Sequence, residues 1–457
     1  MIRLALTERD RQAIEAHFSE LAPRESGAFL LLHEAPSPRG ARLVVSRPYF
    51  PSAEEWERRG PDQLTPSARL LSAMVSFANL ARAGLLFVHS HPSRHHPTAL
   101  STTDERALDS LAEVMPDLLD GPFAAAVVGP RGWAGKVHRD RQWIDIDRIT
   151  SAGAGLRVLS PLLASEQVEA IDDRQAEALG PLNAVLRSLD VAVVGCGGLG
   201  SPLAETLTRM GVRRLLLIDC DRLDTPSNVR RVFGARMADL ALRPAPAKVS
   251  IVARNCNFAQ LETEISEIRG DVRNRNVFRG LLDADLVFCA TDSHSSRAPI
   301  DGAALAFNFP VIDCGVRVGM REGYPSGLLA ELRLLGPGRP CLWCRNVLSA
   351  ERIRAENLPA EERRKLAQEG YLVGLEGAEP SVTGLTVFGA GMMASALLGV
   401  LSLDSDLLWD TWLFDALLGD APKPRQVPVD PDCICQRRVS LADWAPIGLL
   451  PDDHGKP

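Results

Sequence analysis

Short apolar runs separated by polar residues predict strands in the first third of the chain. These runs are residues 28–32, 42–45, 85–89 and 124–128. Residues 67–82 instead repeat apolar side chains at the spacing of one helix face. Strands and helices are therefore mixed over residues 1–150, which we predict to form one α/β domain.

A second α/β pattern begins at Val191, where a strand, a glycine-rich turn and a helix follow one another. Further strands are predicted at residues 215–219, 286–290 and 311–314. Strands that alternate with helices favour a mostly parallel sheet with helices on both faces. We predict this domain over residues 181–440, after a linking and wrapping segment at 151–180 and before a C-terminal tail at 441–457.

Two later segments depart from this alternation. Residues 349–380 are charged and helix-prone, and we predict that they form an excursion from the core. Residues 384–403 carry no charge over a length of about 20 residues, which is enough for a membrane span. They contain four glycines and lack flanking Lys, Arg or aromatic anchors. We therefore predict a buried helix and no membrane partner.

Composition and charge narrow the class of protein. At 457 residues the chain is too long for one ordinary core, and its 46% hydrophobic residues are typical of globular protein. The net charge of -7 provides no basic excess for nucleic acid, so no nucleic-acid partner is predicted. The chain start turns polar too early for a signal peptide. Four of the nine cysteines form two tight pairs and five stand alone, which indicates a metal site in a reducing cytoplasm.

Two histidines and an aspartate stand at a spacing that suits a catalytic zinc. His89 and His91 end an apolar strand, and side chains two residues apart on a strand point the same way. Asp104, from a following helix, completes three ligands. Catalytic zinc sites leave a fourth position open, whereas structural sites are usually closed by four ligands. The alternative is a polar loop whose histidines only form hydrogen bonds.

This motif resembles the JAMM/MPN metalloprotease family, whose pattern is a distant Glu, then His-x-His-Pro, then Ser-x-x-Asp. The resemblance covers roughly residues 20–140 and implies a mixed-sheet fold with isopeptidase or peptidase activity. By this resemblance the ligands of a catalytic zinc are His89, His91 and Asp104. Ser101 helps to hold the oxyanion, and Glu25, just ahead of an apolar strand, is the general base.

A glycine-rich turn follows the strand that begins the second domain. Its glycines are Gly195, Gly197, Gly198 and Gly200. They allow a tight turn, and the helix behind them presents free N–H groups to phosphate. Asp219, at the end of the next predicted strand, equally suits an NAD-binding domain in which an acid binds the ribose.

Residues further along favour phosphate chemistry over hydride transfer. They are Asp221, Asn228, Arg231, Lys248 and Asp292. Cationic and amide side chains that reach the same phosphates stabilise charge at an α-phosphate during acyl transfer. An aspartate there can hold the magnesium that bridges phosphate oxygens. A hydride-transfer site does not need this set of cations.

Residues 170–435 resemble the ubiquitin-activating superfamily, including the ThiF/MoeB-type adenylyltransferases of thiamine and molybdopterin biosynthesis. The resemblance implies a Rossmann-like adenylation domain, ATP with Mg²⁺, and a homodimer. It implies that Asp219 binds the ribose and Asp292 the magnesium. The implied phosphate contacts are Asn228, Arg231 and Lys248. Arg174 resembles the arginine that reaches across the dimer to the partner's ATP, and residues 243–247 stretch the spacing before Lys248.

Two cysteine pairs near the end of this domain supply four thiolates. They are Cys341, Cys344, Cys433 and Cys435. Four thiolates suffice for a closed tetrahedral structural zinc, although the second pair is one residue tighter than usual in the family. Relatives that form a thioester carry a cysteine on the loop after the first pair, but none lies between Cys344 and Cys433. We therefore predict direct handover of the adenylate, with Cys314 and Cys196 as outside candidates for a nucleophile.

Together these motifs predict a bifunctional enzyme of a bacterial ubiquitin-like pathway. One site adenylates the C-terminal glycine of a ubiquitin-like carrier, and the other cleaves its precursor or conjugates. A conjugating, ubiquitin-transfer-like protein is a further possible partner. Sulfur-carrier activation with peptidase release, or a scaffold that binds a carrier without turnover, are the alternatives.

Overall fold

The computed structural model describes most of the chain. The described residues are 1–60, 64–92, 98–161, 171, 173–369, 381–402, 409–419, 423–433, 435 and 439–442. Contacts divide the chain into two compact units. The N-terminal unit comprises Met1–Ala164, Ala306–Asn308 and Arg438–Asp443, and the C-terminal unit comprises the remainder. Each unit is built on its own sheet, so the chain has an α/β fold with two separate cores.

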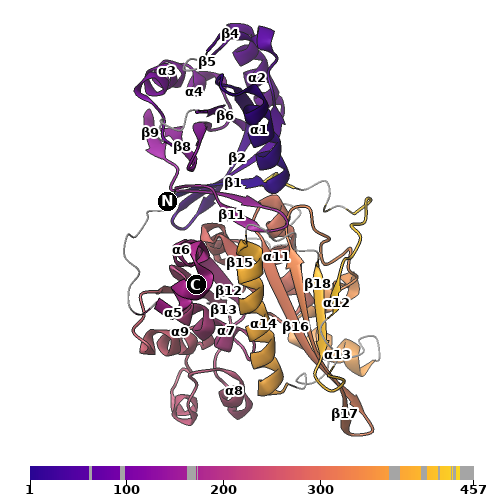
Figure 1. Cartoon of the computed structure of the whole chain (residues 1–457). Coiled ribbons are helices and arrows are strands. Elements are labelled where there is room, and N and C mark those ends of the chain that lie inside the picture. The colour runs from indigo at the N-terminus through magenta and orange to yellow at the C-terminus, as the bar shows by residue number, and fades with distance from the viewer. Residues whose placement is uncertain are drawn as a thin grey trace. The chain divides into compact units, whose positions relative to one another are not determined.

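A nine-stranded mixed sheet forms the centre of the N-terminal unit (Figure 1). In spatial order its strands are β11 (Leu156–Val158), β10 (Arg148–Ala152), β1 (Ile2–Thr7), β3 (Gly40–Tyr49), β2 (Gly27–Ser37), β6 (Gly84–Ser90), β7 (Phe123–Gly129), β8 (Gly132–Arg139) and β9 (Gln142–Asp145). A small separate sheet pairs β4 (Trp56–Arg59) with β5 (Leu64–Pro66). The central strands read as continuous apolar runs because both of their faces are buried.

Helices cover both faces of this sheet. On one face α1 (Glu8–Leu21) packs Ile14 and Phe18 into a core with Leu86 and Val88. On the other face a second core contains side chains of three helices, which are α2 (Ala68–Leu80), α3 (Thr102–Ala112) and α4 (Met115–Leu118). Alternate residues of β6 therefore enter different cores, as the two-residue period of a strand requires.

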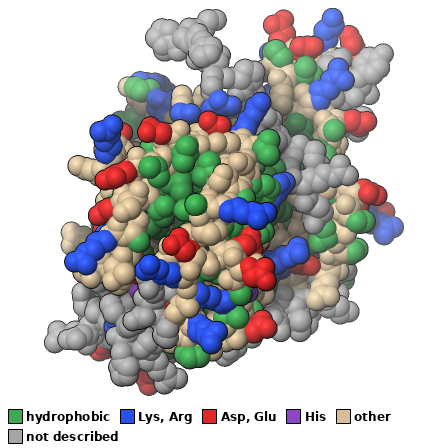
Figure 2. All heavy atoms as spheres, turned by 90° about the horizontal axis from the view of Figure 1, so that it is seen from above, with side chains coloured by type: hydrophobic (Ala, Val, Ile, Leu, Met, Phe, Trp, Pro, Cys, Tyr) green, Lys and Arg blue, Asp and Glu red, His purple; other side chains and the backbone are tan. Residues whose placement is uncertain are grey.

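The α2–α4 side of the unit keeps apolar surface in contact with solvent. Figure 2 shows hydrophobic side chains gathered on the face it presents, with charged side chains around them. Phe77 and Leu80 on α2 are exposed, as are Val114 and Leu118 around α4. Asn79 donates a hydrogen bond of 2.7 Å to the Leu118 carbonyl and so holds the two helices together.

An eight-stranded sheet forms the C-terminal unit. In spatial order its strands are β14 (Glu264–Arg269), β13 (Arg214–Asp219), β12 (Asp190–Val194), β15 (Leu286–Cys289), β16 (Val311–Arg321), β17 (Tyr324–Leu335), β18 (Thr411–Asp415) and β19 (Lys423–Arg425). The first five strands run parallel and the last three are antiparallel to their neighbours. The expected mostly parallel sheet is therefore present, with an antiparallel extension at one edge.

The helices of this unit lie mainly between the strands in sequence. They are α5 (Asp173–Leu179), α6 (Pro181–Ser188), α7 (Gly200–Arg209), α8 (Pro226–Arg231), α9 (Lys248–Phe258), α10 (Arg275–Phe278), α11 (His294–Ala306), α12 (Ala350–Glu356), α13 (Ala360–Gln368) and α14 (Thr383–Leu401). Short 3₁₀ turns occur at Met237–Ala241 and Arg279–Asp283 in this unit, and at Ala53–Glu55 in the N-terminal unit.

Helix α14 is long and apolar enough to span a membrane, by length and composition, and among the described residues it is the one helix of which this holds. Of its most apolar window 61% is buried. It packs on α7, β16 and β17 (Figure 1), and its buried positions include Leu385, Met393 and Leu397. A helix that is apolar all round is typical of a core, which agrees with its packing here.

Three predicted segments lie only partly within the described residues. The segment 151–180, expected to link and wrap, includes the end of β10, all of β11 and all of α5. Residues 349–380 include α12 and α13 as far as residue 369, and residues 370–380 lie outside the described part. The predicted tail at 441–457 is described only to residue 442.

Candidate functional sites

Strand β6 places two histidines at its end in the N-terminal unit. Gly27 of β2 pairs with His89, and the His91 N–H donates to the Val128 carbonyl at the end of β7. The imidazole of His89 stacks on Phe87, with centroids 5.5 Å apart and planes 14° apart. Both histidines are at least 96% buried, so their orientation is fixed by strand pairing and packing.

The donor atoms of His89, His91 and Asp104 form a triangle that a zinc ion fits. The two Nε2 atoms are 3.3 Å apart, and each lies 3.2–3.3 Å from an oxygen of Asp104. A tetrahedral zinc with bonds of about 2.0–2.1 Å holds its ligands about 3.3–3.4 Å apart. The three groups therefore meet the distance requirement of a three-ligand zinc site.

The start of α3 holds Asp104 in this position. Ser101 caps the helix: its Oγ accepts from the Asp104 N–H at 3.1 Å, and the Asp104 carboxylate accepts from the Ser101 N–H at 2.7 Å. Burial disfavours the charged carboxylate, but hydrogen bonds from His89 and His91 outweigh it and hold the Asp104 pKa well below its usual range. Asp104 is therefore ionised, and a capping box orients its carboxylate.

Glu25 lies next to this cluster through long-range strand pairing. It precedes β2, next to Ser26. The Ser90 N–H donates to the Ser26 carbonyl at 2.8 Å, and the Ser26 N–H donates to the Ser90 Oγ at 3.0 Å. The antiparallel register, extended by two residues from Gly27, places Glu25 opposite His91. Glu25 is only 4% exposed. The backbone of a buried acid thus lies beside that of His91.

In the C-terminal unit the strand order reverses at β12. The chain passes from β12 outward to β13 and β14, and then returns to the other side of β12 for β15 and β16. Open parallel sheets bind ligands at such a switch point, beyond the carboxyl ends of the strands. The glycine-rich loop leaves β12 at this point, and Ala290 follows β15 there. The Ala290 N–H donates to the Val194 carbonyl at 2.8 Å, so the two loops adjoin.

Two glycines of the loop are required by close backbone approach. Gly195 has φ +96°, and a Cβ there would lie 2.6 Å from the Ala290 oxygen. A Cβ on Gly200 would lie 1.7 Å from the Gly195 carbonyl oxygen. Gly197 has nothing within 4 Å of its Cβ position, and Gly198 has only ordinary contacts. The first pair shapes the turn, and the second pair leaves its surface open.

We predict that Gly200→Ala lowers the thermal stability of the C-terminal unit and weakens ATP binding, whereas Gly197→Ala changes stability little. The reason is the backbone clash at Gly200 and the open space at Gly197. A loss of about 1–3 kcal/mol is expected for Gly200→Ala, as for overpacking of a core. Thermal melts and ATP titrations of both variants check this, and equal melting temperatures would contradict it.

Acidic and cationic residues gather beside the loop. Asp219 ends β13, and its Oδ2 accepts from the Cys196 N–H at 2.7 Å. Lys248, the first residue of α9, forms a 2.6 Å ion pair with Asp221. Burial raises the Asp219 pKa, with Lys248 opposing the shift. The Lys248 pKa is also raised: burial opposes its charge, but Asp221 and Asp219 outweigh burial, so Lys248 stays protonated.

Helix α8 brings a further cation to the loop. The Arg231 Cβ lies 3.7 Å from the Cβ position of Gly198, and the buried Arg231 Nε has no hydrogen-bond partner among the described residues. Asn228 lies one turn earlier on α8, at a spacing that shares a helix face with Arg231. Ser201 binds this segment to the loop, since its Oγ accepts from the Phe233 N–H at 3.0 Å. Glycine N–H groups and cations therefore converge at the switch point.

Four cysteine sulfurs form a second metal-compatible cluster in the C-terminal unit. Cys341 Sγ lies 3.6 Å from those of Cys344 and Cys433, and Cys344 Sγ lies 3.7 Å from that of Cys435. These separations are too long for disulfides. A tetrahedral zinc with bonds of about 2.3 Å separates sulfurs by about 3.8 Å. The tighter spacing of the second pair thus still permits a four-thiolate site.

The ThiF family matches residues 171–435, more than half of the chain and including the loop, the cations and the cysteine cluster. The chain belongs to the ThiF family. Residues 1–170, with the histidine cluster, lie outside this match.

The relatives of this ThiF-family chain include activating enzymes. Ubiquitin-like modifier-activating enzyme 5 of Aedes aegypti is 27% identical over 300 residues, which is 63% of this chain and 69% of the relative. The enzyme of that name from Drosophila erecta is 25% identical over 344 residues, which is 72% of this chain and 74% of the relative. The crystal structure of E. coli MccB with ATP aligns at 17% identity and TM-score 0.45, over 60% of this chain and 76% of that one.

Not every predicted residue of the ThiF-family region lies at the loop. Asp292 is exposed in the segment between Ala290 and α11, beside the loop. Arg174 on α5 is exposed and lies elsewhere. Its neighbour Gln175 donates a hydrogen bond of 2.9 Å to the Met210 carbonyl. Met210 lies at the end of α7 opposite the glycine loop. Within one chain, therefore, the structure does not bring Arg174 to the other candidate residues.

Sequence reasoning missed the start of α14 as part of this site. The Thr386 side chain lies 3.5 Å from the Cβ position of Gly198, and the Thr383 Oγ1 donates to the Arg230 carbonyl at 3.1 Å. The signal was two hydroxyl residues three apart at the start of an otherwise apolar helix. Their closeness to a loop almost 190 residues earlier was not visible.

The candidate cysteine nucleophiles are buried thiols. Cys314 is 1% exposed and Cys196 is 0% exposed. Burial, together with Asp313, raises the Cys314 pKa to about 12. Burial, together with Asp219, raises the Cys196 pKa well above its usual value. Because the thiolate is the nucleophile, neither environment favours thioester chemistry.

Proposed function

We propose that the ThiF-family unit adenylates the C-terminal glycine of a ubiquitin-like or sulfur-carrier protein with ATP. The observation that carries this proposal is the meeting of the glycine loop with Asp219, Lys248 and Arg231 at the switch point of the sheet. The activating enzymes among the relatives support the same chemistry by their names.

Each residue has a role that follows from its position. The carrier carboxylate attacks the α-phosphorus, forming an acyl-adenylate and releasing pyrophosphate. Asp219 accepts hydrogen bonds from the ribose, and loop N–H groups bind phosphate. Lys248, Arg231 and Asn228 stabilise the charge that develops there. Asp292 and Asp221 offer carboxylate oxygens, the ligands that Mg²⁺ prefers.

Pyrophosphate exchange tests this proposal. Wild-type protein should exchange labelled pyrophosphate into ATP only when a carrier with a free C-terminal glycine is present. We predict that Asp292→Ala lowers the exchange rate by at least about 100-fold, because a proposed ligand of the charge-stabilising magnesium is lost. The exposed Asp432 provides the control, and Asp432→Ala should exchange normally. Exchange that needs no carrier, or that survives in Asp292→Ala, would contradict the proposal.

We further propose a homodimer in which Arg174 reaches the partner's ATP. This is supported by the exposure of Arg174 and its distance from the loop of its own chain. The buried thiols at Cys314 and Cys196 support direct handover of the adenylate to an external thiol, a sulfur donor or a conjugating protein.

We propose that the N-terminal unit is a zinc-dependent peptidase or isopeptidase of the JAMM type that acts on the same carrier. The observation that carries this proposal is the donor triangle of His89, His91 and Asp104, whose sides of 3.2–3.3 Å fit a zinc ion. Zinc with an open ligand position lowers the pKa of a bound water to about 7 and polarises a carbonyl.

The surrounding side chains supply the remaining functions. Glu25 is buried opposite His91 and is placed to take and return a proton as general base and acid. The Ser101 Oγ accepts from the Asp104 N–H, so its own hydroxyl hydrogen remains available to donate to an oxyanion. Cleavage of a carrier with a C-terminal extension, measured together with zinc content, tests this second activity.

A further inference from the structure

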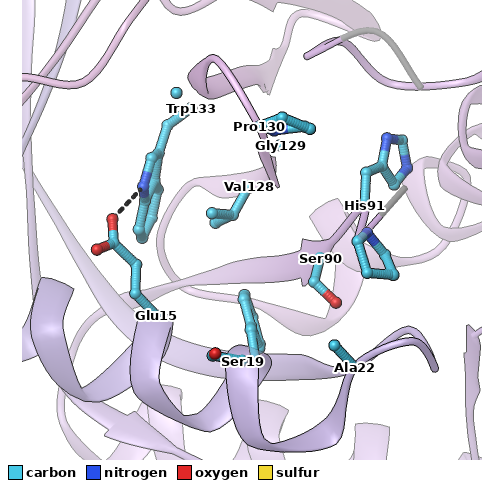
Figure 3. A pocket seen from close by; sticks show the side chains of 12 residues that line it. Glu15, Ser19, Ala22, Ser90, His91, Val128, Gly129, Pro130 and Trp133 are labelled. Atoms are coloured by element: carbon cyan, nitrogen blue, oxygen red, sulfur yellow. Dashed lines mark hydrogen bonds between the residues drawn. The ribbon is translucent and has the colours of Figure 1, made fainter. Parts of the chain in front are cut away.

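A pocket of about 500 Å³ lies beside the donor triangle in the N-terminal unit. It is lined by α1, the end of β6 and the turn between β7 and β8, and His91 belongs to both the pocket and the triangle. Figure 3 shows Glu15 and Trp133 on one side, Ser90 and His91 on the other, and Val128 between them. This volume is ordinary for a ligand site. A molecule in the pocket would therefore touch a proposed zinc ligand.

The pocket wall is mostly apolar and holds one carboxylate. Phe18, Val128 and Trp133 supply apolar surface. Among the described residues that line the pocket, Glu15 is the one acidic residue and there is no lysine or arginine. The Glu15 side chain is 35% exposed, and its Oε1 accepts from the Trp133 Nε1 at 3.1 Å. Trp133 thus holds the carboxylate in place without neutralising its charge.

The neighbouring cation leaves Glu15 able to bind a further donor. Arg11 contacts Glu15, but it also donates to Glu8 at 2.6 and 2.9 Å. Arg11 thus contacts both carboxylates, and Glu8 also has Arg157 at 3.4 Å. An ionised carboxylate offers about four lone-pair sites, and Arg11 and Trp133 use two at Glu15. The lone-pair sites left at Glu15, and the absence of lysine and arginine from the described pocket lining, therefore favour a cationic donor at this end of the pocket.

We propose that this pocket binds a lysine or arginine side chain of the peptide substrate, next to the bond that the N-terminal unit cleaves. The inference rests on the proposed hydrolase function and adds a specificity to it. The aliphatic stem packs between Phe18 and Val128, its charged end bonds to Glu15, and the peptide backbone continues past His91. A substrate with an uncharged side chain at this position leaves the carboxylate without its donor.

Binding of synthetic decapeptides tests the inference without relying on turnover. Each peptide consists of alanine and glycine with a central glycine. In each one, a single position on one side or the other of that glycine carries either arginine or norleucine. Calorimetry uses zinc-loaded Glu25→Gln protein. At one position the arginine peptide should bind about tenfold more tightly, as for a hydrogen bond to a charged group at a partly exposed site. Zinc-loaded wild type should show the same preference in KM rather than kcat.

Glu15→Gln identifies the group that sets the preference. The amide retains an oxygen for the Trp133 Nε1 but carries no charge. This change should abolish the preference for arginine, whereas Glu20→Gln, on the exposed side of the same helix, should keep it. Equal binding of all arginine and norleucine peptides, or a preference that survives Glu15→Gln, would overturn the inference. An intact preference without cleavage of any peptide or carrier would overturn the hydrolase function instead.

Discussion

Glu25→Gln should lower cleavage of a carrier precursor by about 10²- to 10⁴-fold, the usual contribution of a general acid–base group. Zinc should stay bound, because the donor triangle consists of His89, His91 and Asp104 and does not include Glu25. His89→Ala removes one corner of the triangle and should lose both zinc and cleavage. The two variants therefore separate metal binding from proton transfer.

Zinc content by mass spectrometry and cleavage rates, measured on the same preparations, check this prediction. Glu34→Gln is a matched control, because Glu34 lies on β2 and pairs with Arg139 at 2.5 Å, away from the triangle. It should retain both properties. Undiminished zinc in His89→Ala would contradict the ligand assignment. Normal cleavage by Glu25→Gln would contradict the role of the general base.

The closeness of His89, His91 and Asp104 was predictable from sequence because the geometry of this donor triangle is mostly local. His89 lies on β6, His91 directly follows that strand, and Asp104 is the third residue of the next helix. The strand period and a capping box bring the three together. Glu25 is different, since it reaches the site only through the antiparallel register of β2 and β6. The residues alone show only that Glu25 is an acidic residue ahead of a predicted strand. The family resemblance, rather than spacing, singled it out.

The sheet of the N-terminal unit was only partly predictable. The apolar runs at β2, β3, β6 and β7 gave strands in nearly the observed places. Strand β1 was not recognised, although all six of its residues are buried. Its pairing with β10 joins residues 145 positions apart, such as Arg3 and Arg148. Arginines at buried strand positions hide the apolar signal, and no local pattern reports a pairing over that distance.

In the nucleotide site, too, some features were predictable from local sequence and others were not. Glycines and Asp219 come from consecutive elements, and a strand–turn–helix pattern suffices to place them. Helix α14 contributes to the site because it lies against the glycine loop, although it comes late in the sequence of the domain. The switch point itself is a property of strand order, which alternating strands and helices do not specify.

Cys344→Ser should abolish zinc binding at the cysteine cluster and destabilise the C-terminal unit. The four sulfurs connect the segment after β17 to the segment around Cys433. The loop between Cys344 and Cys433 is about 90 residues long. A metal that closes this loop therefore restricts the conformations of the unfolded chain. Zinc binding by four-ligand peptides has an apparent free energy of about 10–16 kcal/mol, a large part of which acts as folding free energy. A serine cannot replace the lost thiolate, so the remaining ligands no longer close the site.

Thermal melts, pyrophosphate exchange and zinc content distinguish a structural metal from packed thiols. Wild-type protein should hold one zinc for each of the two clusters, and Cys344→Ser should keep only the one at the histidines. Cys256→Ser is the matched control, because Cys256 is buried in α9 and belongs to neither cluster. It should retain both zinc ions and melt close to wild type. Equal zinc content and equal melting temperatures in Cys344→Ser and Cys256→Ser would instead show that the four sulfurs only pack against one another.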